Sequence, residues 1–139
     1  MKKFLFLILL SSQISAELMS LECRHLAPDP LFPGHTWPET WDVFTFDKNQ
    51  GATADVYMYK NGELDEIIEE ARLIWNTSSI TVKYVVNPGS PYPLDTTATI
   101  NRENLAYQDK QLLPGLPPSY TTGKCNIVEV VKVIPKKVF

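Results

Sequence analysis

The sequence predicts a small, mostly β domain: an antiparallel barrel or sandwich of about six to seven strands, with at most one short helix and one disulfide. Three observations favour this class. Short runs of β-branched and aromatic residues recur, separated by turn-forming residues. The 139-residue chain contains two cysteines, and it has no internal repeat, heptad pattern or low-complexity tract. One domain with a single modest core follows from these features.

Residues 1–16 have the layout of a secretory signal peptide. Lys2 and Lys3 precede an unbroken apolar run over residues 4–10, and small and polar residues then lead to Ala16. The apolar run is far shorter than the roughly 20 residues that a membrane-spanning helix needs. We therefore expect cleavage after Ala16 and an exported protein, periplasmic or secreted, without a membrane span.

Residues 17–41 are predicted to form an N-terminal arm rich in proline and tryptophan, and residues 42–139 the β-domain. Proline removes backbone donors and disfavours both a helix and a central strand. The arm also contains Trp37 and Trp41, whose rings are too apolar to remain in water. We therefore expect an irregular arm that lies against the domain.

The two cysteines, Cys23 and Cys125, lie near opposite ends of the exported chain. In an exported protein an isolated pair is most simply a disulfide. Neither residue belongs to a C-x-x-C motif, which argues against a metal-binding or catalytic pair. The bond would close a loop of about 100 residues and contribute about 4–5 kcal/mol on the chain-entropy model.

The first two strands are predicted at residues 41–46 and 53–60, with the turn-forming run 47–52 between them. The first has apolar groups on both faces, and the second alternates aliphatic residues with tyrosines. Asn61 and Gly62 follow. This dipeptide tolerates the positive φ of a type I′ turn and is the strongest hairpin signal in the chain.

Residues 63–75 fit two interpretations. Their apolar residues recur at helical spacing, and acidic residues crowd the front, as a helix dipole favours. A strand should nevertheless return after Asn-Gly, and the end of the segment alternates. Residues 80–86 are dense in β-branched and aromatic residues and predict a strand after the turn at 76–79. We favour strands on both sides of that turn, with a helix at 63–75 as the alternative.

The remaining strands are predicted at residues 96–100, 104–108 and 124–133. A proline-rich loop at 87–93 precedes the first of these strands, and a second at 112–123 precedes the last.

The C-terminal third contains the tripeptide I-N-R at 100–102 and G-K-C at 123–125, and it ends K-K-V-F at 136–139. It resembles small exported bacterial proteins of no assigned activity, in which an I-N-R strand is followed by a turn and a G-x-C strand close to a basic, aromatic end. The T-G turn usual after I-N-R is replaced here by Glu103-Asn104. The resemblance implies a compact, mostly β, exported domain and carries over no catalytic residue.

Composition and motifs exclude several functions. The formal net charge is −3 at pH 7 and falls further once the signal peptide leaves, so nucleic acid is not an expected partner. No nucleotide loop, serine-hydrolase motif or zinc-protease motif is present. The only histidines, His25 and His35, are interpreted as structural or loop residues, and the acidic run at 63–70 as a solvated face. We expect no catalytic residue, no metal and no cofactor.

We therefore expect a non-enzymatic exported domain that binds another protein or an envelope component. Its contact surface is predicted to include the aromatic residues Trp37, Trp41, Tyr92 and Tyr120. One alternative is a lipocalin-like carrier of a small apolar ligand, which requires a cavity through the barrel. Another is a small secreted hydrolase, which requires a cleft with two carboxyls and a raised pKa. The sequence leaves the oligomeric state open.

Overall fold

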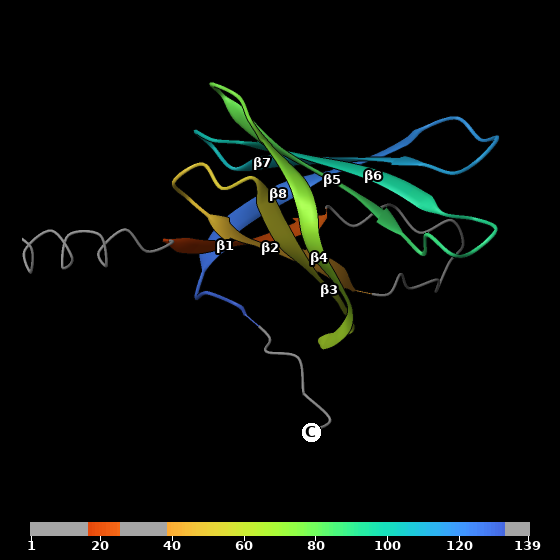
Figure 1. The fold of residues 1–139 in the computed structure, drawn as a ribbon, viewed down its shortest axis with the longest axis horizontal. Coiled ribbons are helices and arrows are strands. Elements are labelled where there is room, and N and C mark those ends of the chain that lie inside the picture. The colour runs from red at the N-terminus through yellow and green to blue at the C-terminus, as the bar shows by residue number, and fades with distance from the viewer. Residues whose placement is uncertain (1–16, 26–38, 133–139) are drawn as a thin grey trace, which may run out of the picture.

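The computed structural model describes residues 17–25 and 39–132 (Figure 1). This part of the chain forms eight antiparallel strands that close into one barrel in sequence order, with the last strand against the first. The described residues include no helix long and apolar enough to cross a bilayer. The strands are β1 (Leu18–His25), β2 (Thr40–Asp47), β3 (Thr53–Lys60), β4 (Glu63–Trp75), β5 (Ser79–Val86), β6 (Leu94–Asn101), β7 (Ala106–Leu112) and β8 (Ser119–Val128).

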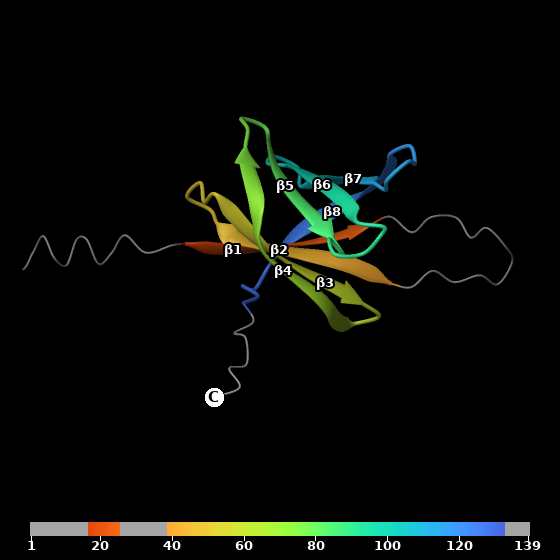
Figure 2. The same cartoon turned by 45° about the vertical axis from the view of Figure 1, so that its right-hand side comes forward.

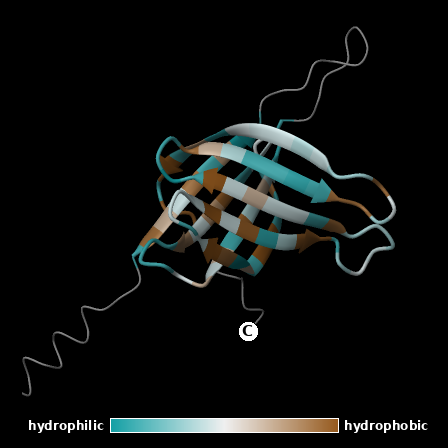
Figure 3. Ribbon diagram, turned by 90° about the horizontal axis from the view of Figure 1, so that it is seen from above, coloured by the Kyte–Doolittle hydropathy of each residue, from teal (hydrophilic) through white to brown (hydrophobic). Residues whose placement is uncertain are grey.

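Alternation along the strands builds the barrel interior, as the banded hydropathy in Figure 3 shows. In β5 every second residue is buried, and the residues between them are exposed or half-buried. Fully buried side chains from four strands form the apolar core in the middle of the barrel. These residues are Phe44, Val56, Val82, Ala98 and Ile100.

Of the two predicted architectures, the antiparallel barrel is confirmed and the sandwich is not, and the predicted number of about six to seven strands is wrong. The additional strand is β1, which lies within residues 17–41, the range predicted as an arm. Its own pattern is weak, and it is held by pairing with β2 on one side and β8 on the other. Strand β8 also begins earlier than predicted, because residues 119–123 pair with β7. Residues 1–16, 26–38 and 133–139 lie outside the described residues.

Residues 63–75 form strand β4 and not the alternative helix. Asn61 and Gly62 both have positive φ, 52° and 84°, as a type I′ hairpin requires. Each of two register shifts against β3 adds one residue to β4, one of them beside Glu70, whose φ is 56°. Only residues 72–75 pair with β5. The β3–β4 hairpin therefore diverges from the β5–β6 hairpin, as Figure 2 shows.

The predicted disulfide is confirmed: Cys23 and Cys125 lie directly opposite each other on β1 and β8 and are both fully buried. The bond covalently links the first and last strands, whose pairing closes the barrel. Gly123, two residues away on β8, allows the strands to approach closely here. A Cβ atom at this position would overlap the backbone carbonyl oxygen of Arg24.

Candidate functional site

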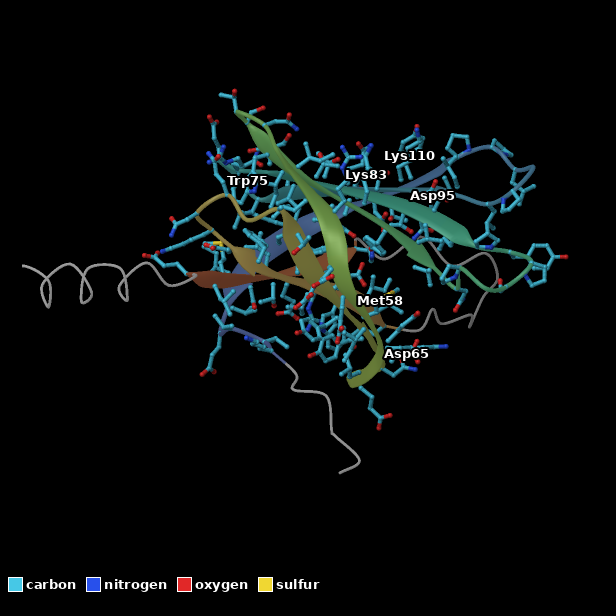
Figure 4. All side chains as sticks on the ribbon, in the orientation of Figure 1. Met58, Asp65, Trp75, Lys83, Asp95 and Lys110 are labelled. Atoms are coloured by element: carbon cyan, nitrogen blue, oxygen red, sulfur yellow. A yellow bond between two sulfur atoms is a disulfide. The ribbon has the colours of Figure 1, made fainter. Side chains whose placement is uncertain are left out.

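The two ends of the barrel differ in chemistry. We call the end where β1, β3, β5 and β7 finish the acidic end, and the end where they begin the apolar end. Each end contains a pocket, of about 170 Å³ and about 220 Å³ respectively. Figure 4 shows this separation along β4, where Asp65 lies at the acidic end and Trp75 at the apolar end.

Three titratable side chains converge at the acidic end: His25 on β1, Asp42 on β2 and Asp109 on β7. Each lies two residues along its strand from a buried residue of the core, namely Cys23, Phe44 and Tyr107. Alternation therefore turns all three into the barrel and places them in one layer above the apolar core. One nitrogen or oxygen atom from each lies within 4.8 Å of the other two.

Hydrogen bonds hold the two carboxyls from one side. The Tyr107 hydroxyl lies 3.4 Å from Asp42 Oδ2 and 3.2 Å from Asp109 Oδ2, and its single proton can be donated to only one of them at a time. Gln111 Nε2 also donates to Asp109 Oδ2, at 3.4 Å. The His25 ring packs against the Tyr107 ring, with centroids 5.2 Å apart. These bonds leave Asp109 Oδ1 unused.

The cluster is deeply buried and lacks positive charge. Asp42 is 7% exposed and Asp109 is 1% exposed. Among the described residues, the ion pairs formed by lysine and arginine involve neither of these carboxyls. His25 Nδ1 and Asp109 Oδ1 are the only buried side-chain polar atoms of this part of the chain without a hydrogen-bond partner. Buried polar atoms are rarely left unpaired, so two in one cluster indicate a missing partner.

Burial dominates the electrostatics of this layer. It raises the pKa of Asp42 to about 7, and the nearby Asp109 charge adds to this effect, while hydrogen bonds from Tyr107 and Tyr84 oppose it. Burial likewise raises the pKa of Asp109 to about 6 against hydrogen bonds from Tyr107 and Gln111. Burial lowers the pKa of His25, which favours the neutral form of the imidazole.

This arrangement permits two kinds of chemistry. Two carboxylates and a neutral imidazole can hold a cation between them. Two carboxyls that titrate near neutrality can also exchange a proton with a bound substrate. The pocket is smaller than the roughly 300–1,000 Å³ typical of drug-sized ligands, which limits its occupant to an ion or a small molecule. Its rim carries one lysine and one further carboxylate, Lys60 and Asp65.

The structure describes three of the four predicted contact residues, Trp41, Tyr92 and Tyr120, and none of these three belongs to the cluster. Trp41 is half-buried, stacks on Tyr59 with ring centroids 5.4 Å apart, and is covered by the Arg24 guanidinium at 4.1 Å. Tyr92 and Tyr120 are 72% and 55% exposed and belong to the β5–β6 loop and to β8. Trp37 lies outside the described residues. A contact role for these aromatics stays a prediction.

The pocket at the apolar end is lined mainly by aliphatic and aromatic side chains, among them Met19, Phe46 and Trp75. Two cationic side chains, Arg102 and Lys48, also line this pocket, and each has a partner elsewhere in the protein. Arg102 donates to the Asn76 carbonyl oxygen at 2.8 Å, and Lys48 pairs with Glu17 at 3.0 Å. Among the described residues that line it, this pocket therefore provides mainly apolar surface.

Sequence analysis assigned no function to Asp42 and Asp109 and interpreted His25 as structural. The available signal was an aspartate at an inward-facing position of an apolar strand. Comparison with known proteins gives no match: no family model, no curated protein and no solved structure is significantly similar to this chain. The fold alone defines a class, the eight-stranded up-and-down barrels, which includes carriers of small ligands.

Proposed function

We propose that this protein is an exported, non-enzymatic binding protein whose barrel takes up a small cationic ligand at the acidic end. One observation carries the proposal: Asp42 and Asp109 are buried side by side, face a pocket, and have no cationic partner in the described part of the chain. A buried carboxylate is tolerated when it is paired or coordinates a cation. A cation in the pocket would supply that partner.

The surroundings support binding more than a purely structural role. A structural carboxyl pair would be expected to have all of its oxygens hydrogen-bonded by its neighbours. Here Asp109 Oδ1 and His25 Nδ1 belong to the same cluster and have no hydrogen-bond partner within residues 17–25 and 39–132. A ligand that donates to these atoms, or is coordinated by them, would complete the layer.

Two other binding functions have less support. A lipocalin-like carrier of an apolar ligand fits the barrel fold, but the pockets at the two ends, of about 170 Å³ and about 220 Å³, are smaller than the roughly 300–1,000 Å³ typical of drug-sized ligands. Binding of a protein or an envelope component could involve the exposed Tyr92 and Tyr120. Export itself is supported by the disulfide, which is typical of oxidising compartments.

The proposal is tested by thermal unfolding of the full exported chain in the presence of cations. After dialysis against EDTA, the protein is titrated with methylammonium, putrescine, Ca²⁺, Mn²⁺ and Zn²⁺. At least one of these should raise the melting temperature in a concentration-dependent way, because a ligand that binds only the folded state stabilises it. The Asp109→Asn variant should lose this response, and Asp95→Asn, which changes an exposed carboxylate on β6, should keep it. The absence of any response at millimolar concentrations would contradict the proposal.

A second candidate, the small hydrolase, is favoured by one observation, the raised pKa of both carboxyls. Such a pair can provide a general acid and a general base. The test is hydrolysis of chromogenic glycosides and of a casein digest between pH 4 and pH 8. Activity that is lost in both Asp42→Asn and Asp109→Asn would establish the hydrolase, and its absence from the wild type would remove this candidate.

A further inference from the structure

We propose that His25, Asp42 and Asp109 bind a divalent transition-metal ion, of which Zn²⁺ is the best probe. The inference rests on the proposed function, because it names the cation that the acidic end takes up. It is carried by three potential ligand atoms within 4.8 Å of one another, each from a different strand of one barrel.

The donor set selects the class of metal. One imidazole nitrogen and two carboxylate oxygens suit Zn²⁺, Mn²⁺, Fe²⁺ and Co²⁺. Ca²⁺ prefers six to eight oxygen ligands, and Mg²⁺ is usually bound by carboxylates, phosphates and several waters. Three protein ligands also leave a position open for water or another small molecule. The open pocket over the cluster, lined by Met58 and Thr96 among others, can accommodate this fourth ligand.

The distances permit coordination after a small adjustment. Bonds of about 2.0–2.2 Å to tetrahedral zinc separate the ligand atoms by roughly 3.3–3.6 Å. Since the observed separations do not exceed 4.8 Å, the ligand atoms need to approach one another by at most about 1.2–1.5 Å. Rotation of the side chains on a fixed backbone can achieve this, because the three strands are already in place.

The hydrogen bonds are arranged as the outer shell of a metal site would be. Asp109 Oδ2 accepts from Tyr107 and Gln111, while Oδ1 has no partner among the described residues and is available to coordinate. The Tyr107 hydroxyl lies between Asp109 Oδ2 and Asp42 Oδ2 and can donate its single proton to either of them. Bonds of this kind fix the orientation of ligating carboxylates. The free oxygen of Asp109 and the free Nδ1 of His25 are therefore the atoms that a metal ion would engage.

A histidine variant separates a metal from other cations. His25→Phe keeps a ring against Tyr107 but removes both nitrogens. A matched control is Asp65→Asn, which changes an exposed carboxylate at the rim of the same pocket. The full exported chain is stripped with EDTA and titrated with Zn²⁺ by calorimetry, and Co²⁺ is added separately to record its visible absorption bands.

We expect one Zn²⁺ per wild-type chain, and Co²⁺ bands that Zn²⁺ displaces and Ca²⁺ does not. His25→Phe should weaken Zn²⁺ binding at least about 100-fold, since loss of an outer-shell partner alone costs about 10–100-fold. Asp109→Asn, which keeps the size of the side chain, should weaken it similarly, and Asp65→Asn should stay within about twofold of wild type. Circular dichroism establishes that each variant is folded.

Two results would overturn the inference: no Zn²⁺ binding by the folded wild type at millimolar concentration, or equal binding by wild type and folded His25→Phe. If Zn²⁺ does not bind the wild type, but methylammonium or putrescine binds it and not Asp109→Asn, the metal site is wrong and the proposed function stands. If no cation binds the wild type, both are wrong.

Discussion

Replacement of Asp42 by asparagine should change the stability of the barrel in a strongly pH-dependent way. The ordinary pKa of this carboxyl is 3.8, and in the folded protein burial raises it to about 7. Between these values the unfolded chain releases a proton that the folded protein retains, so the unfolded state gains stability as the pH rises. Each pKa unit corresponds to about 1.4 kcal/mol, so this penalty grows by roughly 3–4 kcal/mol between pH 4 and pH 8. Asparagine does not ionise and avoids the penalty.

The assay is urea unfolding, followed by tryptophan fluorescence, of the wild type and Asp42→Asn at intervals from pH 4 to pH 8 in EDTA. The free energy of unfolding of the variant, minus that of the wild type, should rise with pH and level off above pH 7. His25, whose pKa burial lowers, titrates in both proteins, so its effect largely cancels in this difference. Asp95→Asn serves as the exposed control and should give a nearly constant difference. A flat or falling difference for Asp42→Asn would refute the burial argument.

Three further changes test the fold by urea unfolding. Removal of the disulfide by reduction should lower the free energy of unfolding by about 4–5 kcal/mol, because Cys23 and Cys125 are 102 residues apart; equal stability of both forms would contradict this. Gly123→Ala should lower the free energy of unfolding by at least about 2 kcal/mol, because its Cβ would overlap the β1 backbone. Gly89→Ala, where nothing lies within 4 Å of the added Cβ, should be nearly neutral. Similar losses in the two variants would refute the close approach of β8 to β1 at Gly123. Phe44→Ala should cost about 3–5 kcal/mol if the barrel is solid at its middle, and a loss under 1 kcal/mol would indicate that it is not.

The fold could be predicted where short-range signals determine the structure. The Asn61-Gly62 hairpin and the dense β-branched run in β5 are both local patterns, and the structure confirms them. Strand β1 was missed because its conformation depends on pairing with β8, about 100 residues away in the chain. The two cysteines did indicate that these distant segments meet. The register, with Cys23 opposite Cys125, needed the three-dimensional structure.

The candidate site is harder to predict because no motif contains it. Its three residues come from three separate strands, and each is unremarkable in its local sequence: Asp42 lies between Trp41 and Val43, and Asp109 between Gln108 and Lys110. Their convergence depends on closure of the barrel and on the register of four neighbouring strands. A pattern argument can show that Asp42 shares a strand face with Phe44. It cannot show that Asp109 occupies the same layer.

The position of the disulfide connects stability with the acidic end. The three candidate ligand strands, together with β8, are consecutive around the barrel in the order β7, β8, β1 and β2. The disulfide lies in the middle of this group, two residues along β1 from His25. Ionisation of Asp42 costs roughly 4 kcal/mol at neutral to basic pH, and the disulfide contributes about the same amount in the opposite direction. A free-energy cost of this size is a large fraction of the roughly 5–15 kcal/mol by which a domain is usually stable. The disulfide therefore offsets the free-energy cost of ionising Asp42. It also links β1 and β8, which lie between the strands that carry the two carboxyls.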